Sequence, residues 1–230
     1  MPRPTVIVPG YFAQASEYST LENFLKEQGL PTITVPLSKW DWLPTVGGRS
    51  MLPILRKIDS TVEQLLQEYP ESLLNIIGHS AGGWITRIYL GDQPYDVHGE
   101  KLEVIWSKNK QIHSLITLGT PHRSGEYWTK KNLNFVNDNY PGAYYRDINY
   151  ICIAGKLIYG KPDLSNWLAY NSYKLTLGSG LTWGDGITPI ESAHLEGANN
   201  ITLEGVGHAP NNKYPWYGSI EVAQQWLQYL

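Results

Sequence analysis

The feature that most constrains this 230-residue chain is a glycine-flanked serine, Ser80, in the pentapeptide GHSAG at residues 78–82. An apolar run over residues 73–77 precedes it, and residues 83–90 follow with helical spacing. Strand, sharp turn and helix is the context that a G-x-S-x-G motif needs, because the turn then presents the serine hydroxyl at a strand end, near a helix N-terminus that stabilises negative charge. The pentapeptide alone is a weak signal, because a glycine-flanked serine also occurs in ordinary turns, so its meaning depends on the rest of the chain.

Short apolar runs alternate with amphipathic segments along the whole sequence. Predicted strands cover residues 5–8, 32–35, 73–77, 112–118, 148–154 and 201–203, and predicted helices cover 19–28, 52–69, 83–90 and 219–230. This alternation predicts an α/β fold with a mostly parallel sheet of about six strands, helices on both faces, and one domain over residues 1–230. Segments 121–149 and 155–180 are long for loops and rich in aromatic residues, so we expect them to form a lid or cap over the site.

Composition excludes several classes of function. A net charge of −3 gives no reason to expect nucleic acid as a partner. Because Cys152 is the single cysteine, an intrachain disulfide and a cysteine-based metal site are excluded. His98, His113 and His194 show no metal-ligand spacing, so we expect no metal and no cofactor. No apolar run is long enough to span a membrane, and no signal-peptide pattern opens the chain, so a cytoplasmic location is expected.

Two further residues complete a candidate catalytic set with Ser80. Asp185 lies in a turn between Gly184 and Gly186, and His208 follows the last predicted strand. A serine hydroxyl is a weak nucleophile that needs a base, usually a histidine oriented by a carboxylate. Each residue also has an ordinary structural interpretation, as a turn aspartate or a loop histidine. The order Ser80, Asp185, His208, with each at a strand end, favours the catalytic interpretation.

An oxyanion hole would need two backbone N–H groups beside the serine. Ala81, the residue after the nucleophile, supplies one, and the loop after the first strand supplies the other. Because Pro9 has no N–H and Gly10 forms the turn, the second donor is Tyr11 or, as the alternative, Phe12.

Together these motifs resemble the α/β-hydrolase family of lipases and esterases. The resemblance rests on residues 8–11, 78–83, 118–122, 184–186 and 207–208, which span almost the whole chain in consistent order. More narrowly, the chain resembles small lipase-like hydrolases of cyanobacteria and plant plastids. It departs from the larger members because residue 5 begins what would be their third strand, and its oxyanion loop lacks the His-Gly or Gly-Phe pair that is commoner in lipases.

The resemblance implies hydrolysis of carboxylic acyl esters, with lipid-like esters as the expected substrates, through an acyl-enzyme on Ser80. The substrate pocket is expected around Phe12, His79, His122, Trp128 and Ile187, with His79 packed behind the nucleophile. An acyltransferase or thioesterase using the same residues is the alternative, and a non-catalytic binding protein is a third hypothesis. The sequence leaves open a transient contact with a membrane surface and the oligomeric state.

The aromatic residues of segments 121–149 and 155–180 lead to an expectation about the substrate. If they were solvated loops, much apolar surface would be exposed, so we expect a partly apolar wall above Ser80 and a preference for medium or long acyl chains. The alternative is that these aromatic rings pack against one another and leave a site for small esters.

Overall fold

The computed structural model describes residues 3–99, 104–210 and 213–230. In this part of the chain a six-stranded sheet has the strand order β2-β1-β3-β4-β5-β8, and every neighbouring pair is parallel. The predicted α/β fold is therefore confirmed. The strands are β1 (Thr5–Val8), β2 (Thr32–Thr34), β3 (Leu74–His79), β4 (Ile112–Leu118), β5 (Asn149–Lys156) and β8 (Asn199–Glu204).

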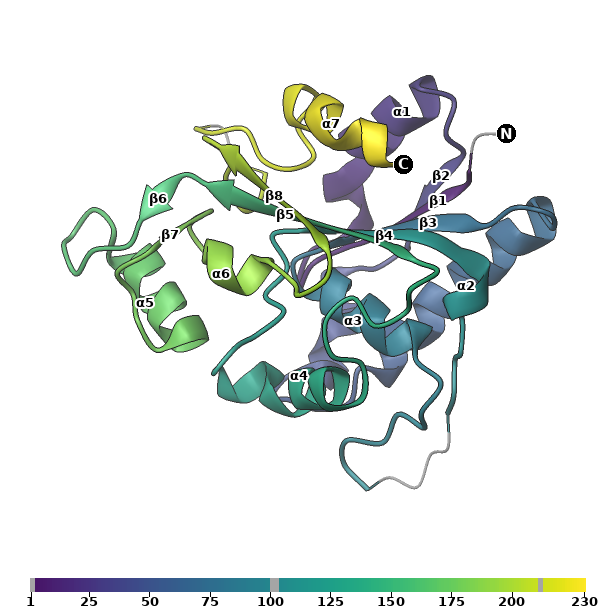
Figure 1. Ribbon diagram of the computed structural model, residues 1–230, viewed down its shortest axis with the longest axis horizontal. Helices are drawn as coiled ribbons and strands as arrows, with labels where there is room; N and C mark the ends of the chain where they lie inside the picture. The colour runs from purple at the N-terminus through teal and green to yellow at the C-terminus, as the bar shows by residue number, and fades with distance from the viewer. Residues whose placement is uncertain (1–2, 100–103, 211–212) are drawn as a thin grey trace.

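Helices cover both faces of this sheet, as Figure 1 shows. One face packs against α1 (Ser19–Glu27) and α7 (Ile220–Trp226), and the other packs against α2 (Leu52–Glu68), α3 (Ala81–Leu90) and α4 (Tyr127–Asn139). Successive strand residues point to opposite faces, so every residue of a strand covered on both sides is buried, and most are apolar. All residues of β1 and β3 are buried for this reason.

A smaller two-stranded antiparallel sheet extends from the C-terminal end of β5. It pairs β6 (Ile158–Tyr159) with β7 (Trp183–Gly184), and α5 (Trp167–Leu177) connects them, on the left in Figure 1. The short helix α6 (Ile190–Ala193) follows β7. Short 3₁₀ helices complete the described elements: η1 (Ala15–Tyr18), η2 (Lys39–Thr45), η3 (Asn109–Gln111) and η4 (Leu227–Tyr229).

The first expected cap segment, residues 121–149, is largely part of the core. Its helix α4 buries Leu133 and Val136 in the cluster that α2 and α3 also form. Arg87 of α3 fixes the C-terminal end of α4, because its guanidinium donates to the Asn137 side chain (3.1 Å) and to the Tyr140 carbonyl (2.6 Å). Only the beginning of the segment reaches the candidate site.

The expected aromatic wall is corrected for four of its residues, all in segment 121–149. Four of the aromatic residues that we expected above Ser80 pack against one another in a chain of edge and tilted ring contacts instead: Phe135, Tyr140, Tyr144 and Tyr145. Aromatic side chains meet in this way because their ring edges and faces carry opposite partial charges. Periodicity alone could not distinguish this packing from a substrate-facing wall.

No helix in the described residues is both long enough and apolar enough to cross a lipid bilayer.

Candidate active site

Ser80 lies in a strained turn between β3 and α3. Its backbone has φ 50° and ψ −123°, which a residue with a side chain rarely adopts. The turn is tight because its neighbours are glycines: a Cβ on Gly78 would lie 2.5 Å from Gly83 Cα, and one on Gly82 would lie 2.4 Å from the Val8 carbonyl oxygen. Strain of this kind is stored where the surrounding structure enforces it, and here it sets the serine side chain at the C-terminal edge of the sheet.

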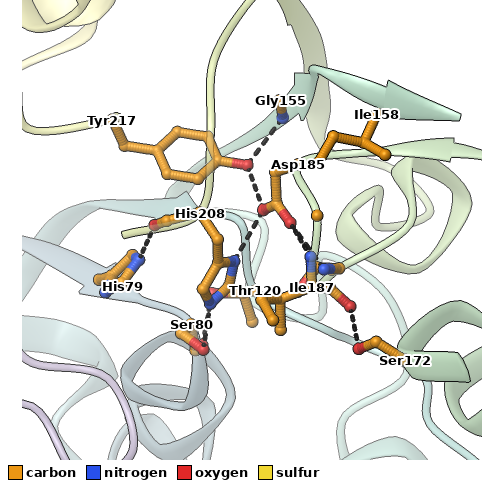
Figure 2. Close-up of polar contacts among 12 residues, drawn as sticks. His79, Ser80, Thr120, Gly155, Ile158, Ser172, Asp185, Ile187, His208 and Tyr217 are labelled. Carbon is orange, nitrogen blue, oxygen red and sulfur yellow. Dashed lines mark hydrogen bonds and ion pairs between the residues drawn. The ribbon is translucent and has the colours of Figure 1, made fainter. Parts of the chain in front are cut away.

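Ser80, His208 and Asp185 form a hydrogen-bonded row, shown in Figure 2. His208 Nε2 lies 3.0 Å from Ser80 Oγ, and His208 Nδ1 lies 2.8 Å from Asp185 Oδ2. Because a carboxylate can only accept, Nδ1 carries the proton and Nε2 is left to accept from the serine hydroxyl. This is the geometry in which a histidine can remove the serine proton.

The Asp185 side chain is fully buried, and each of its two carboxylate oxygens accepts two hydrogen bonds. Oδ1 accepts from the Ile187 N–H (2.9 Å) and the Thr188 N–H (2.6 Å), and Oδ2 accepts from the Tyr217 hydroxyl (2.7 Å) as well as from His208. Burial alone would raise the pKa of this carboxyl, but the neighbouring His208 and these hydrogen bonds outweigh burial and lower the pKa. Asp185 is therefore held as a carboxylate.

Tyr217 supports this carboxylate from behind. Its hydroxyl accepts from the Gly155 N–H (2.7 Å) at the end of β5 and donates to Asp185 Oδ2, as Figure 2 shows. Burial, followed by the charge of Asp185, raises the pKa of Tyr217 well above its usual value, so the phenol keeps its proton. The sequence offered no signal that singled out this tyrosine among sixteen.

His79 lies behind the nucleophile and connects the loop at Gly10 to the loop at His208 through hydrogen bonds. The Gly10 N–H donates to the Tyr18 hydroxyl (2.9 Å), the hydroxyl pairs with His79 Nδ1 (2.6 Å), and His79 Nε2 pairs with the His208 carbonyl (2.8 Å). Burial, then the neighbouring His208, lowers the pKa of His79 to about 3, so the ring is neutral and its single proton lies on Nε2, facing that carbonyl. With an exposure of only 3%, His79 supports the base loop and has little surface for substrate.

Three backbone N–H groups near Ser80 have no acceptor in the described part of the chain. They belong to Tyr11, Phe12 and Ala81, whereas the Gly10 N–H is already bonded to Tyr18. Phe12 has a positive φ of 58°, which is a strained conformation for a bulky residue. A Cβ on Gly10 would lie 2.9 Å from Ser80 Cβ, so this loop approaches the nucleophile closely. Tyr11 and Phe12 both remain candidates for the second oxyanion donor.

Three cavities adjoin these residues. The first, which we name the α3–α5 cavity, has a volume of about 400 Å³ and contains Ser80. The second, named the α5 groove, has a volume of about 530 Å³ and is mainly apolar, with Leu157, Ile158, Leu168 and Pro210 in its wall. The third, of about 180 Å³, lies between the loop of residues 10–13 and His79, Ser80 and His208, so it also reaches the nucleophile. Ile187 and His208 border both the first and the second cavity.

The structure places only some of the expected pocket residues at a cavity beside Ser80. Ile187 borders the two larger cavities, and Phe12 and His79 border the smallest. His122 was placed wrongly: it is 1% exposed and contacts Thr117, Arg87 and Cys152 behind the sheet, so it does not line a cavity at Ser80. The side chain of Trp128 lies outside the described part of the structure.

Sequence reasoning also missed Thr120 and Glu126. The Thr120 hydroxyl donates to the Ser80 carbonyl (2.8 Å), which fixes the turn from the end of β4, and Glu126 lines the α3–α5 cavity. Thr120 is part of the motif at residues 118–122, so a signal existed, whereas Glu126 stands in no motif. Among the described residues no three His, Cys, Asp or Glu side chains are grouped to hold a metal ion.

No protein-family model and no curated protein sequence matches this chain. Solved structures do resemble it. Phospholipase PlaB from Legionella pneumophila superposes with a TM-score of 0.62 at 14% identity, over 91% of this chain and 54% of the phospholipase, so the chain spans about half the length of that protein.

Two further structures match over more of their own length. An alpha-beta serine hydrolase homologue from Coxiella burnetii has a TM-score of 0.57 at 11% identity, over 99% of this chain and 85% of the homologue. The lin2722 gene product of Listeria innocua has a TM-score of 0.54 at 13% identity, over 100% and 95%. At these identities the likeness concerns the fold. The chain is thus built on the fold of the α/β-hydrolase superfamily, the family that its sequence motifs indicate.

Proposed function

We propose that this protein is a serine hydrolase of carboxylic acyl esters that works through an acyl-enzyme on Ser80. The observation that carries the proposal is the row from Ser80 Oγ to His208 Nε2 and from His208 Nδ1 to Asp185 Oδ2. The three N–H groups of Tyr11, Phe12 and Ala81 support it, because they have no acceptor in the described part of the chain and are free to donate to an oxyanion. The likeness to a phospholipase and to a serine hydrolase homologue agrees with it.

The reaction would proceed in two halves. His208 Nε2 accepts the hydroxyl proton as Ser80 Oγ bonds to the ester carbonyl carbon, and the resulting oxyanion is stabilised by backbone N–H groups. His208 then gives the proton to the leaving alcohol oxygen, which leaves an acyl group on Ser80. Water attacks this ester in the same manner and releases the acid. Asp185 remains a carboxylate throughout and stabilises the imidazolium that forms twice.

The test is a set of kinetic measurements on p-nitrophenyl butyrate. Ser80→Ala and His208→Ala are each expected to lower kcat/KM by a factor on the order of 10⁴, and the double variant to be scarcely worse than either, because the two residues act as one unit. Ser72→Ala, at the opposite end of β3, is the matched control and is expected to leave activity unchanged. Full activity in Ser80→Ala would refute the proposal, and losses that multiply would show that His208 is not the base for Ser80.

Product analysis in the presence of added alcohols separates hydrolysis from acyl transfer. Free acid as the main product supports the hydrolase. A new ester as the main product would assign the same residues to an acyltransferase.

A further inference from the structure

The α3–α5 cavity contains a carboxylate that the proposed hydrolysis does not use. Glu126 stands at the N-terminal end of α4 and lines the cavity that holds Ser80. Although a carboxylate at a helix N-terminus often caps it, the Glu126 side chain makes no capping hydrogen bond. It also makes no hydrogen bond or ion pair with any described side chain, and burial raises its pKa without a partner to oppose the shift. A half-buried carboxylate is costly unless something pairs with it.

Three hydroxyl groups that line the same cavity have already donated their protons within the protein. Ser172 donates its proton to the Ile187 carbonyl (2.6 Å), Thr176 donates to the Ser172 carbonyl (2.9 Å), and Thr129 donates to the Glu126 carbonyl (3.4 Å). Their oxygens keep free lone pairs, because a hydroxyl that has donated can still accept. No lysine or arginine belongs to the described lining of this cavity. The lining therefore favours a ligand that brings hydrogen-bond donors and positive charge.

From these contacts we infer that the α3–α5 cavity selects esters that carry a primary ammonium group, with Glu126 as the residue that recognises it. The hydrocarbon portion of such a substrate fits the α5 groove, which meets the cavity at Ile187 and His208. A primary ammonium suits the lining better than a neutral alkyl group, because it offers three N–H donors to the carboxylate and hydroxyl oxygens. This inference rests on the proposed esterase function.

The experiment compares pairs of esters that differ only by –NH₃⁺ against –CH₃. The first pair is p-nitrophenyl 6-aminohexanoate and p-nitrophenyl heptanoate, which varies the acyl portion. The second is 6-aminohexyl butyrate and heptyl butyrate, which varies the alcohol portion. In at least one pair the wild type is expected to prefer the ammonium ester in kcat/KM, and Glu126→Gln is expected to reduce that preference about tenfold or more, because it removes a charge-assisted hydrogen bond.

The matched control is Glu221→Gln, which makes the same change in net charge on the exposed side of α7, on the other face of the sheet. It is expected to leave both preferences unchanged. The methyl-terminated esters are the reference within each pair, and Glu126→Gln is expected to lower kcat/KM on the ammonium ester far more than on its methyl partner, which separates recognition from damage to Ser80 or to folding. A preference that Glu126→Gln leaves intact in both pairs, or no preference in the wild type, would overturn the inference.

A binding measurement keeps the inference separate from the proposed function. Hexylammonium chloride is titrated into wild-type, Glu126→Gln and Glu221→Gln proteins, with the shift of tryptophan fluorescence or NMR signals as the readout. Weaker binding by about tenfold in Glu126→Gln alone supports the inference even if no ester is cleaved, a result that would refute only the esterase. Equal binding by all three proteins would contradict the recognition role of Glu126 even if both esters are cleaved.

Discussion

Tyr217→Phe measures what the Tyr217 hydroxyl contributes to Asp185, the carboxylate of the candidate triad Ser80, His208 and Asp185. The substitution removes one oxygen and leaves the ring in place, so no steric change accompanies it. Two hydrogen bonds of 2.7 Å are lost, one to the Asp185 carboxylate and one from the Gly155 N–H. A hydrogen bond to a charged group contributes about 1.5–3 kcal/mol, and a buried N–H left without an acceptor costs about 1–3 kcal/mol. The free energy of unfolding is therefore expected to fall by about 3–5 kcal/mol.

The effect on catalysis should be smaller and confined to kcat. Asp185 keeps its bonds from the Ile187 N–H, the Thr188 N–H and His208, so the imidazole stays oriented, but the carboxylate is less well stabilised. We expect kcat to fall about tenfold with KM unchanged, and the pKa of Asp185 to rise. Urea denaturation and ester kinetics measure both effects. Tyr159→Phe, whose exposed hydroxyl bonds only to the Leu181 carbonyl, is the control. Wild-type stability together with wild-type kcat in Tyr217→Phe would refute this account of Asp185.

Three further predictions follow from other contacts. Asp185→Asn is expected to lower kcat/KM less than His208→Ala, because a misoriented imidazole still works inefficiently; a neutral Asp185→Asn would mean that another carboxylate orients His208. On p-nitrophenyl acetate, butyrate, octanoate and palmitate, kcat/KM is expected to rise beyond butyrate, since each methylene buried in the α5 groove contributes about 0.8 kcal/mol; a steady fall would contradict it. His79 has a folded-state pKa of about 3, below the 6.5 of an unfolded chain, so its contribution to stability is full above pH 6.5 and is lost as pH falls toward 3. Between pH 7 and pH 4.5 the wild type is expected to lose about 3 kcal/mol more unfolding free energy than His79→Gln, measured by urea denaturation, and equal losses would contradict the assignment.

The sheet and its helices could be predicted from the sequence because their signals are local. Strands β1 and β3 are short, mostly apolar runs bounded by turn residues, and α2 keeps one apolar face over its length. The serine turn was predictable because the required glycines are visible in the sequence. The structure shows why glycine is required there: a Cβ on Gly78 would collide with Gly83, and a Cβ on Gly82 would collide with the Val8 carbonyl.

The parts that could not be predicted depend on contacts between distant segments. Whether Tyr140 and Tyr145 cover the site or pack together depends on where α4 docks, and Arg87 determines that from 50 residues away. His122 stands next to a strand end, as a pocket residue would, yet its ring turns into the space beside Thr117. Tyr217 and Glu126 carry no motif at all, so only their position in the fold reveals them.

The most direct test of the central claim is covalent labelling of the nucleophile. A fluorophosphonate probe is incubated with the wild type, Ser80→Ala and His208→Ala, and the labelled peptide is mapped by mass spectrometry. The account predicts stoichiometric labelling of the wild type on Ser80, much slower labelling of His208→Ala and none of Ser80→Ala. Labelling on another residue, or an unlabelled wild type that still cleaves esters, would contradict it.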